Sequence, residues 1–116
     1  MSMSKYNVLR GIHVDKQAWR LVSCLYGNVF FVVVDCSRTY RHQRFWLNHN
    51  GCKGVLVPSG YGVGLYVTSE VAVMHYLWSL PYDLARQDTY RYDDPRFGIE
   101  WPFEGRAPIL SERDAF

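Results

Sequence analysis

Short apolar runs separated by turn residues recur along the first two thirds of the chain, and this pattern limits the possible folds most strongly. The run 29–35 is almost continuously apolar, which is typical of a strand buried on both faces. Gly27 and Asn28 precede it as a tight hairpin turn. We therefore expect an all-β protein, an antiparallel sandwich or jelly roll. The expected strands are 8–14, 20–26, 29–35, 39–47, 55–57, 65–68 and 71–79.

The sequence changes character after residue 80. Four of the five prolines lie there, and helix has little room beyond one turn near 83–87. This C-terminal third is expected to wrap the sheet as irregular structure. Upstream, glycines 60, 62 and 64 form a GxGxG string. No helix follows that could direct its positive end at a phosphate, so we interpret the string as a cramped turn.

Composition narrows the functional classes. A chain of 116 residues is most simply one domain, 1–116. The net charge of +2 is too small to indicate a nucleic-acid partner, and the basic residues at 38, 41 and 44 are interpreted as a solvated face. Three irregularly spaced cysteines fit neither a disulfide framework nor a zinc site. With no signal peptide and no segment long enough to span a membrane, we expect a cytoplasmic protein.

His13 is the first candidate for catalysis. It lies at the end of an apolar strand that also carries Arg10, and Asp114 lies where the returning chain could support it. Imidazole suits proton abstraction because its pKa lies near working pH, and an aspartate would fix its tautomer. The alternative is a histidine that only packs or faces solvent.

Tyrosine and arginine supply the other candidates. Alternation places Tyr76 and Trp78 on one strand face, where Tyr76 could act as a general acid or simply pack. Tyr82 could offer its ring to a nucleobase or lie on the surface. Arg10 and Arg20 could bind an anion or form rim salt bridges. Scattered histidines argue against a metal, and no serine or cysteine has the context of a nucleophile.

Several motifs in one order resemble those of the dTDP-4-dehydrorhamnose 3,5-epimerases. The resemblance runs from about Asn7 to Asp114 and implies a jelly-roll barrel of the cupin type that uses no metal and no cofactor. The motifs are Val-Leu-Arg-Gly-Ile-His (8–13), Gly-Asn-Val-Phe-Phe-Val-Val-Val-Asp (27–35), Val-Pro-Ser-Gly-Tyr-Gly-Val-Gly (57–64), Tyr-Asp-Asp-Pro-Arg-Phe-Gly-Ile-Glu-Trp-Pro (92–102) and Ile-Leu-Ser-Glu-Arg-Asp (109–114).

The resemblance also implies a reaction. A 4-keto group makes the neighbouring C3 and C5 protons of a nucleotide-activated 6-deoxy sugar removable, and the resulting enolate is reprotonated from the other face. His13 matches the family's base, Asp114 its partner in the dyad and Tyr76 the acid. The substrate-binding positions are Arg10 at the diphosphate, Tyr82 at the thymine, and Arg20 and Arg113. A homodimer is expected, because large apolar sheet faces favour burial against a second subunit.

Three positions depart from the family pattern. Arg20 replaces a lysine expected to stabilise the enolate. Val63 replaces a histidine and Phe31 replaces an aspartate, and both replacements are expected to remove a polar group from the pocket. Family members also carry a sizeable section ahead of the residues that match Asn7, so a shortened chain would need another way to cover its sheet edge. Two alternatives to an epimerase follow: a degenerate cupin that binds a nucleotide sugar or glycan without turnover, and a sugar-nucleotide ketoisomerase.

Overall fold

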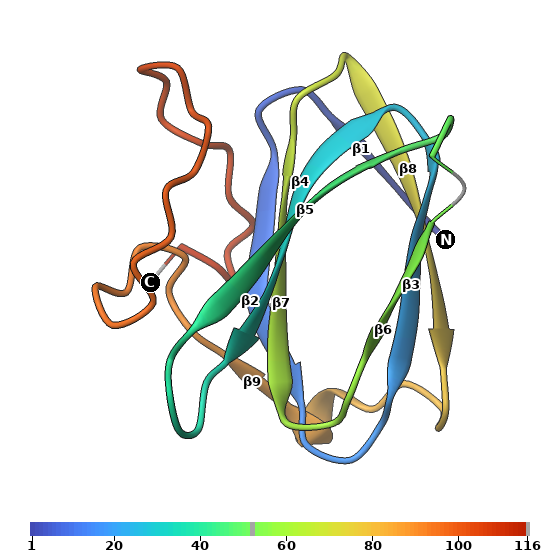
Figure 1. The fold of residues 1–116 in the computed structure, drawn as a ribbon, viewed down its shortest axis with the longest axis vertical. Helices are drawn as coiled ribbons and strands as arrows, with labels where there is room; N and C mark the ends of the chain where they lie inside the picture. The colour runs from blue at the N-terminus through green and yellow to red at the C-terminus, as the bar shows by residue number, and fades with distance from the viewer. Residues whose placement is uncertain (52, 116) are drawn as a thin grey trace.

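The computed structural model describes residues 1–51 and 53–115, which form two antiparallel sheets packed face to face (Figure 1). One sheet has the strand order β1-β8-β3-β6 and the other β5-β4-β7-β2-β9. The prediction of an all-β sandwich is confirmed. The elements are β1 (Ser2–Lys5), β2 (Leu9–Asp15), β3 (Arg20–Tyr26), β4 (Asn28–Asp35), β5 (His42–Asn48), β6 (Gly54–Val57), β7 (Tyr61–Val67), β8 (Val71–Trp78), the 3-10 turn η1 (Leu84–Arg86) and β9 (Gln87–Thr89).

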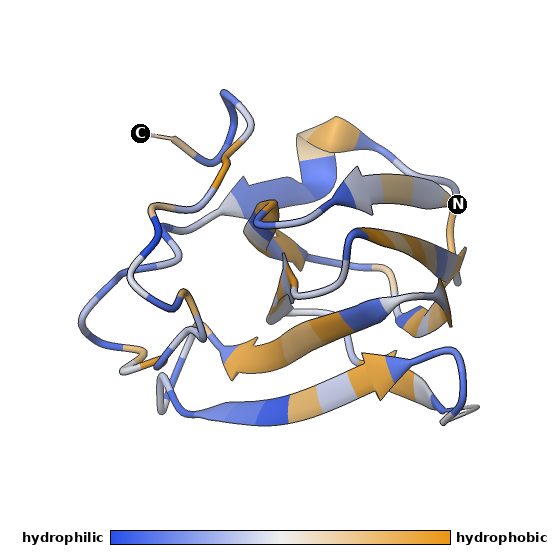
Figure 2. Ribbon diagram, turned by 90° about the horizontal axis from the view of Figure 1, so that it is seen from above, coloured by the Kyte–Doolittle hydropathy of each residue, from blue (hydrophilic) through white to orange (hydrophobic). Residues whose placement is uncertain are grey.

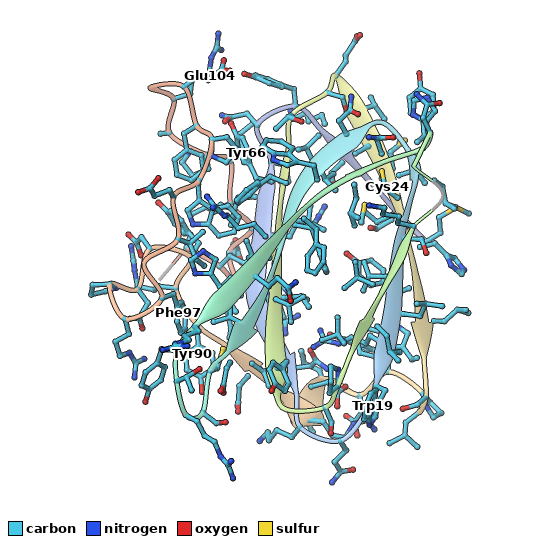
Figure 3. The ribbon with its side chains drawn as sticks, viewed as in Figure 1. Trp19, Cys24, Tyr66, Tyr90, Phe97 and Glu104 are labelled. Carbon is cyan, nitrogen blue, oxygen red and sulfur yellow. The ribbon has the colours of Figure 1, made fainter. Side chains whose placement is uncertain are left out.

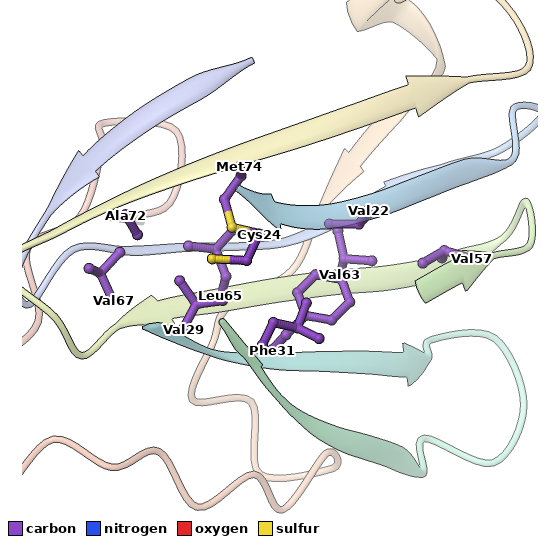
Figure 4. Packing of buried hydrophobic residues seen from close by; sticks show 11 residues of the cluster. Val22, Cys24, Val29, Phe31, Val57, Val63, Leu65, Val67, Ala72 and Met74 are labelled. Carbon is purple, nitrogen blue, oxygen red and sulfur yellow. The ribbon is translucent and has the colours of Figure 1, made fainter. Parts of the chain in front are cut away.

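The main core lies between the two sheets (Figure 4). Strand β4 is buried on both faces, as its continuous apolar run predicts. Phe31 points into the space between the sheets, whereas Phe30 and Val32 belong to a second cluster on the outer face. The larger cluster consists of Val22, Cys24, Val29, Phe31, Leu47, Val57, Val63, Leu65, Val67, Ala72 and Met74.

The C-terminal segment, residues 90–115, covers the outer face of the β5-β4-β7-β2-β9 sheet, on the side of the molecule opposite β3 and β6 (Figure 1). Figure 3 shows Tyr66, Tyr90 and Phe97 on this side, while Cys24 lies near the other sheet. Backbone hydrogen bonds join Tyr90 to Ile12 in both directions. The segment is irregular, as predicted, because its backbone hydrogen bonds close local turns or go to β2 and do not form a regular ladder of its own. Figure 2 shows that hydrophobic residues concentrate in the strands while much of this segment is hydrophilic.

The structure corrects the expected elements in several places. The sequence did not predict β1 or β9. The glycine string is not one turn: Gly60 has a φ of +85° and turns the chain, but Gly62 and Gly64 lie inside β7. A Cβ on Gly62 would come within 2.5 Å of the Ile12 side chain, so these glycines allow close packing. Strand β5 begins at His42 rather than at residue 39. Cys24 and Cys36 are buried free thiols as expected, and Cys52 lies outside the described residues.

Candidate active site

A cavity of about 200 Å³ is lined by residues from both sheets and from the segment that follows β8. Its lining includes every sequence-predicted site residue except Asp114, which lies behind one of them. The predicted residues on the cavity wall are Arg10, His13, Arg20, Tyr76, Tyr82 and Arg113. Val63, Leu65 and Trp78 add apolar surface, and Gln87 adds an amide.

A bulge in β2 directs Arg10 and His13 to the same cavity. Residues three apart on a regular strand point to opposite faces. Here the pairing with β7 shifts, since Gly11 is opposite Gly64 and His13 is opposite Val63. The extra residue, Ile12, turns into the outer apolar cluster. One inserted residue reverses the alternation of the side chains beyond it, and it thereby brings the arginine and the histidine together.

His13 and Asp114 form a close pair, although 101 residues separate them. The Nε2 atom of His13 lies 2.6 Å from Oδ1 of Asp114. Asp114 is 1% exposed, and its Oδ2 accepts hydrogen bonds from the Gly11 backbone N–H and the Ser111 hydroxyl, both at 3.2 Å. Burial acts to raise the pKa of Asp114. The hydrogen bond and charge of His13, together with hydrogen bonds from Gly11 and Ser111, outweigh burial and hold this pKa below its ordinary value. The carboxylate is therefore ionised and fixed behind the imidazole.

Tyr76 reaches the cavity from the opposite sheet. It lies on β8, whereas His13 lies on β2, and both side chains line the same space. Burial raises the pKa of the Tyr76 hydroxyl, against the opposing charges of Arg10 and Arg20. A partly buried phenol of this kind holds its proton at neutral pH and can deliver it to a group in the cavity.

Arg20 is held at the cavity wall by main-chain acceptors. It is 2% exposed, and its Nη2 and Nη1 donate to the carbonyls of Tyr61 at 2.8 Å and His13 at 3.4 Å. Its guanidinium lies 5.5 Å from the centre of the Trp78 ring. Burial lowers the pKa of Arg20, although a guanidinium stays charged in proteins. Its Nε is buried and has no hydrogen-bond partner among the described residues.

Arg113 and Tyr82 form part of the cavity rim. Arg113 Nε donates to the Thr89 hydroxyl at 3.0 Å and Nη1 to the Tyr82 hydroxyl at 3.4 Å, while Nη2 is buried without a partner in the described chain. Tyr82 is 53% exposed and packs edge-on against Trp78 at 5.4 Å. The rim therefore presents a cation beside an aromatic ring with an accessible surface.

Sequence reasoning missed one polar residue of the cavity wall, Gln87, and misplaced Phe31. Gln87 was not singled out. Its Nε2 donates to Oδ2 of the fully buried Asp15 at 2.7 Å, a contact across 72 positions that no local pattern signals. Phe31 does not line the cavity, because it lies in the core against Phe45. Of the two apolar replacements discussed above, only Val63 changes the cavity wall.

The described residues contain neither a metal-binding cluster nor a helix suited to crossing a membrane. Within 1–51 and 53–115, no group of three histidine, cysteine, aspartate or glutamate side chains is placed to hold a metal ion. In the same residues, no helix has the length and apolar character needed to cross a membrane.

Fold and cavity together define a class: a cupin-type β-sandwich whose cavity carries a histidine–carboxylate pair across from a partly buried tyrosine. Comparison with known proteins assigns the chain to one family. A family model described as dTDP-4-dehydrorhamnose 3,5-epimerase matches residues 1–116, and the chain belongs to this family.

Similar proteins bear the same description. The dTDP-4-dehydrorhamnose 3,5-epimerase of Mycobacterium tuberculosis (strain ATCC 25618 / H37Rv) is 34% identical over 122 residues, covering 98% of this chain and 60% of that protein. The enzyme of Salmonella typhimurium is 33% identical over 121 residues, covering 98% and 66%. The chain thus spans about 60% of the length of the first of these relatives.

Solved structures show the same likeness. The Legionella pneumophila dTDP-6-deoxy-D-glucose-3,5-epimerase in complex with dTDP-4-keto-L-rhamnose superposes with a TM-score of 0.90 at 34% identity, covering 98% of this chain and 63% of that one. A 4-keto-6-deoxy sugar epimerase from the novobiocin gene cluster of Streptomyces spheroides gives 0.89 at 35% identity, covering 97% and 59%.

Proposed function

We propose that the protein epimerises a nucleotide-activated 4-keto-6-deoxy sugar of the dTDP-4-keto-6-deoxyglucose type, in bacterial surface-polysaccharide or deoxysugar biosynthesis. One observation carries the proposal: His13, backed by Asp114, and Tyr76 enter one cavity from opposite sheets. A base and an acid on opposite sides of a sugar ring are what inversion at carbon requires, because the proton leaves one face and returns to the other.

The proposed steps use groups already in place. Nε2 of His13 is engaged with Asp114, so Nδ1 is free to take the proton beside the ketone. The C–H electrons move into an enolate, and the guanidinium of Arg20, which lines the cavity, supplies a positive charge for its oxygen. Tyr76 then gives its proton to the opposite face of the carbon. Asp114 stabilises the imidazolium formed on His13.

Cavity size and charge agree with this class of substrate. The cavity of about 200 Å³ is smaller than the ~300–1,000 Å³ typical of sites that enclose a whole drug-sized ligand, so it would hold only part of a nucleotide sugar. A sugar ring fits within it, and a nucleotide would lie across the rim. Arg10 and Arg113 provide cations for a diphosphate, and the exposed ring of Tyr82 provides a face for the base.

Solvent exchange tests the proposal directly. The protein is incubated with dTDP-4-keto-6-deoxyglucose in D₂O, and the H3 and H5 signals are followed by NMR. We expect exchange that is lost in His13→Asn and Tyr76→Phe. His75→Asn is the matched control, because His75 adjoins Tyr76 on β8 without lining the cavity. No exchange above buffer, or equal loss in the control, would contradict the proposal.

One observation favours a second candidate, a protein that binds nucleotide sugars without turnover. Val63 lies opposite His13 on the neighbouring strand and makes that wall apolar. A ligand present at 100 times its dissociation constant stabilises the folded state by about 2.7 kcal/mol. Thermal stabilisation by dTDP without proton exchange at the sugar would select this candidate over the epimerase.

The proposal includes a homodimer in the cytoplasm. On the outer face of the β1-β8-β3-β6 sheet, Leu21 lies opposite Leu77 on one side and Leu56 on the other. Leu56 is 60% and Leu77 55% exposed. An apolar row of this kind favours burial against a second copy through a two-fold interface. The free thiols of Cys24 and Cys36 suit a reducing compartment.

A further inference from the structure

Two serines of β1 face the same interior as the catalytic candidates. Strand β1 pairs with β8, with Ser2 opposite Met74 and Ser4 opposite Ala72. Met74 and Ala72 belong to the core between the sheets. Ser4 is 8% exposed, whereas Met3 between the two serines is 72% exposed. Alternation along the strand therefore turns both hydroxyl groups inward and the methionine outward.

Each inward serine lies beside a different member of the site. The Ser4 hydroxyl accepts a hydrogen bond from Nε of Arg10 at 2.9 Å. Ser2 lies diagonally across from Tyr76, which is two residues beyond Met74 on the same face of β8, and such diagonal neighbours are within reach of a long side chain. Burial raises the pKa of Tyr76, and the nearby Ser2 side chain acts in the opposite direction. One short strand thus supports the candidate acid at one position and the anion-binding arginine at the other.

We propose that Ser2 is a positioning residue for proton delivery by Tyr76, and that Ser4 positions Arg10 for substrate binding. This inference rests on the proposed epimerase function. When Tyr76 gives its proton to the enolate carbon, the O–H electron pair stays on its oxygen as a phenolate. The Ser2 hydroxyl donates to that oxygen, and hydrogen bonds to an ionised oxygen are stronger than those to a neutral one. Water returns a proton to Tyr76 and receives the one held by His13, which closes the cycle.

The two serines are matched in strand, face and chemistry, so the variants Ser2→Ala and Ser4→Ala control for each other. We expect Ser2→Ala to lower kcat for deuterium incorporation about tenfold or more with little change in KM, the factor associated with losing a hydrogen bond to a charged group. Ser4→Ala is expected to raise KM with kcat nearly unchanged, because Arg10 holds the ground state and the transition state alike. Ser2→Thr, which keeps the hydroxyl, should restore kcat.

A second readout needs no substrate. In protein labelled with ¹³Cζ-tyrosine, the Tyr76 resonance is assigned by its absence from Tyr76→Phe. It should shift in Ser2→Ala, return in Ser2→Thr and stay in place in Ser4→Ala. Thermal melting followed by circular dichroism checks that both alanine variants remain folded.

The outcomes separate the two proposals. Normal wild-type turnover with an unmoved Tyr76 resonance in Ser2→Ala, or with equal kcat losses in the two alanine variants, would overturn the positioning role alone. A wild-type protein that exchanges no protons, while the Tyr76 resonance still depends on Ser2, would overturn the epimerase function and the catalytic meaning of this contact together.

Discussion

Replacing Asp114 by asparagine tests the histidine–carboxylate pair with little change in volume. Asp114 is 1% exposed and lies 2.6 Å from Nε2 of His13. The variant removes the charge that stabilises the imidazolium when His13 takes a proton. A hydrogen bond to a charged group contributes about 1.5–3 kcal/mol, and about 1.36 kcal/mol corresponds to a factor of ten in rate. We therefore expect Asp114→Asn to slow deuterium incorporation about 10- to 150-fold.

The assay is the initial rate of deuterium incorporation at saturating substrate, with circular dichroism as the check on folding. Asp88→Asn is the control, because Asp88 is half exposed and lies 3.7 Å from the Lys16 ammonium, and surface ion pairs of this kind contribute about 0–1 kcal/mol. If folded Asp114→Asn retained the rate of Asp88→Asn, the carboxylate would have no part in proton abstraction and the reasoning from this geometry would fail.

Three further predictions concern stability and assembly. Gly62→Ala should destabilise the protein by about 1–3 kcal/mol through overpacking. Gly51→Ala should leave the denaturation midpoint nearly unchanged, because its Cβ would lie at an ordinary contact distance of 3.6 Å from the Asn48 carbonyl oxygen. The hydrogen bonds that lower the pKa of Asp114 despite its burial stabilise the fold above its unfolded pKa of about 3.9, and this contribution is lost as pH falls through the folded pKa. The free energy of unfolding should therefore fall more steeply between about pH 5 and 2 in the wild type than in Asp114→Asn. Leu77→Glu should give a monomer by light scattering, and an unchanged mass would exclude this face as the dimer interface.

Strands that carry their own pattern could be predicted from the sequence, and strands that depend on a partner could not. Strand β4 is apolar at nearly every position because one face lines the inner core and the other lies under the C-terminal segment. Strand β1 offers one large apolar residue, Met3, and that residue points outward. It pairs with β8, about 70 residues away in the sequence, and this pairing turns its two serine hydroxyls inward. A local sequence pattern does not indicate so distant a contact.

The glycines of β7 show the same limit. Read locally, a GxGxG string indicates a turn. In the structure, a Cβ on Gly64 would lie 2.6 Å from the Ile12 side chain and 3.0 Å from the Trp101 ring. Both neighbours come from distant parts of the chain, and Ile12 occupies its place because of the bulge in β2. The glycines are required by packing that exists only after the sheet and the C-terminal segment have come together.

In the candidate site, the sandwich core and the segments outside it have different roles. The sandwich core fixes β2 and β8 on opposite sides of the cavity, but it does not orient the groups that move protons. Orientation comes from two segments outside the central strands. Residues 2–4 lie beside Tyr76 and hydrogen-bond Arg10, and residues 111–114 contact His13 and the rim. Because these two segments contribute little to the core, substitutions in them should lower the rate of exchange more than the free energy of unfolding. Substitutions of core residues such as Phe31 should do the reverse.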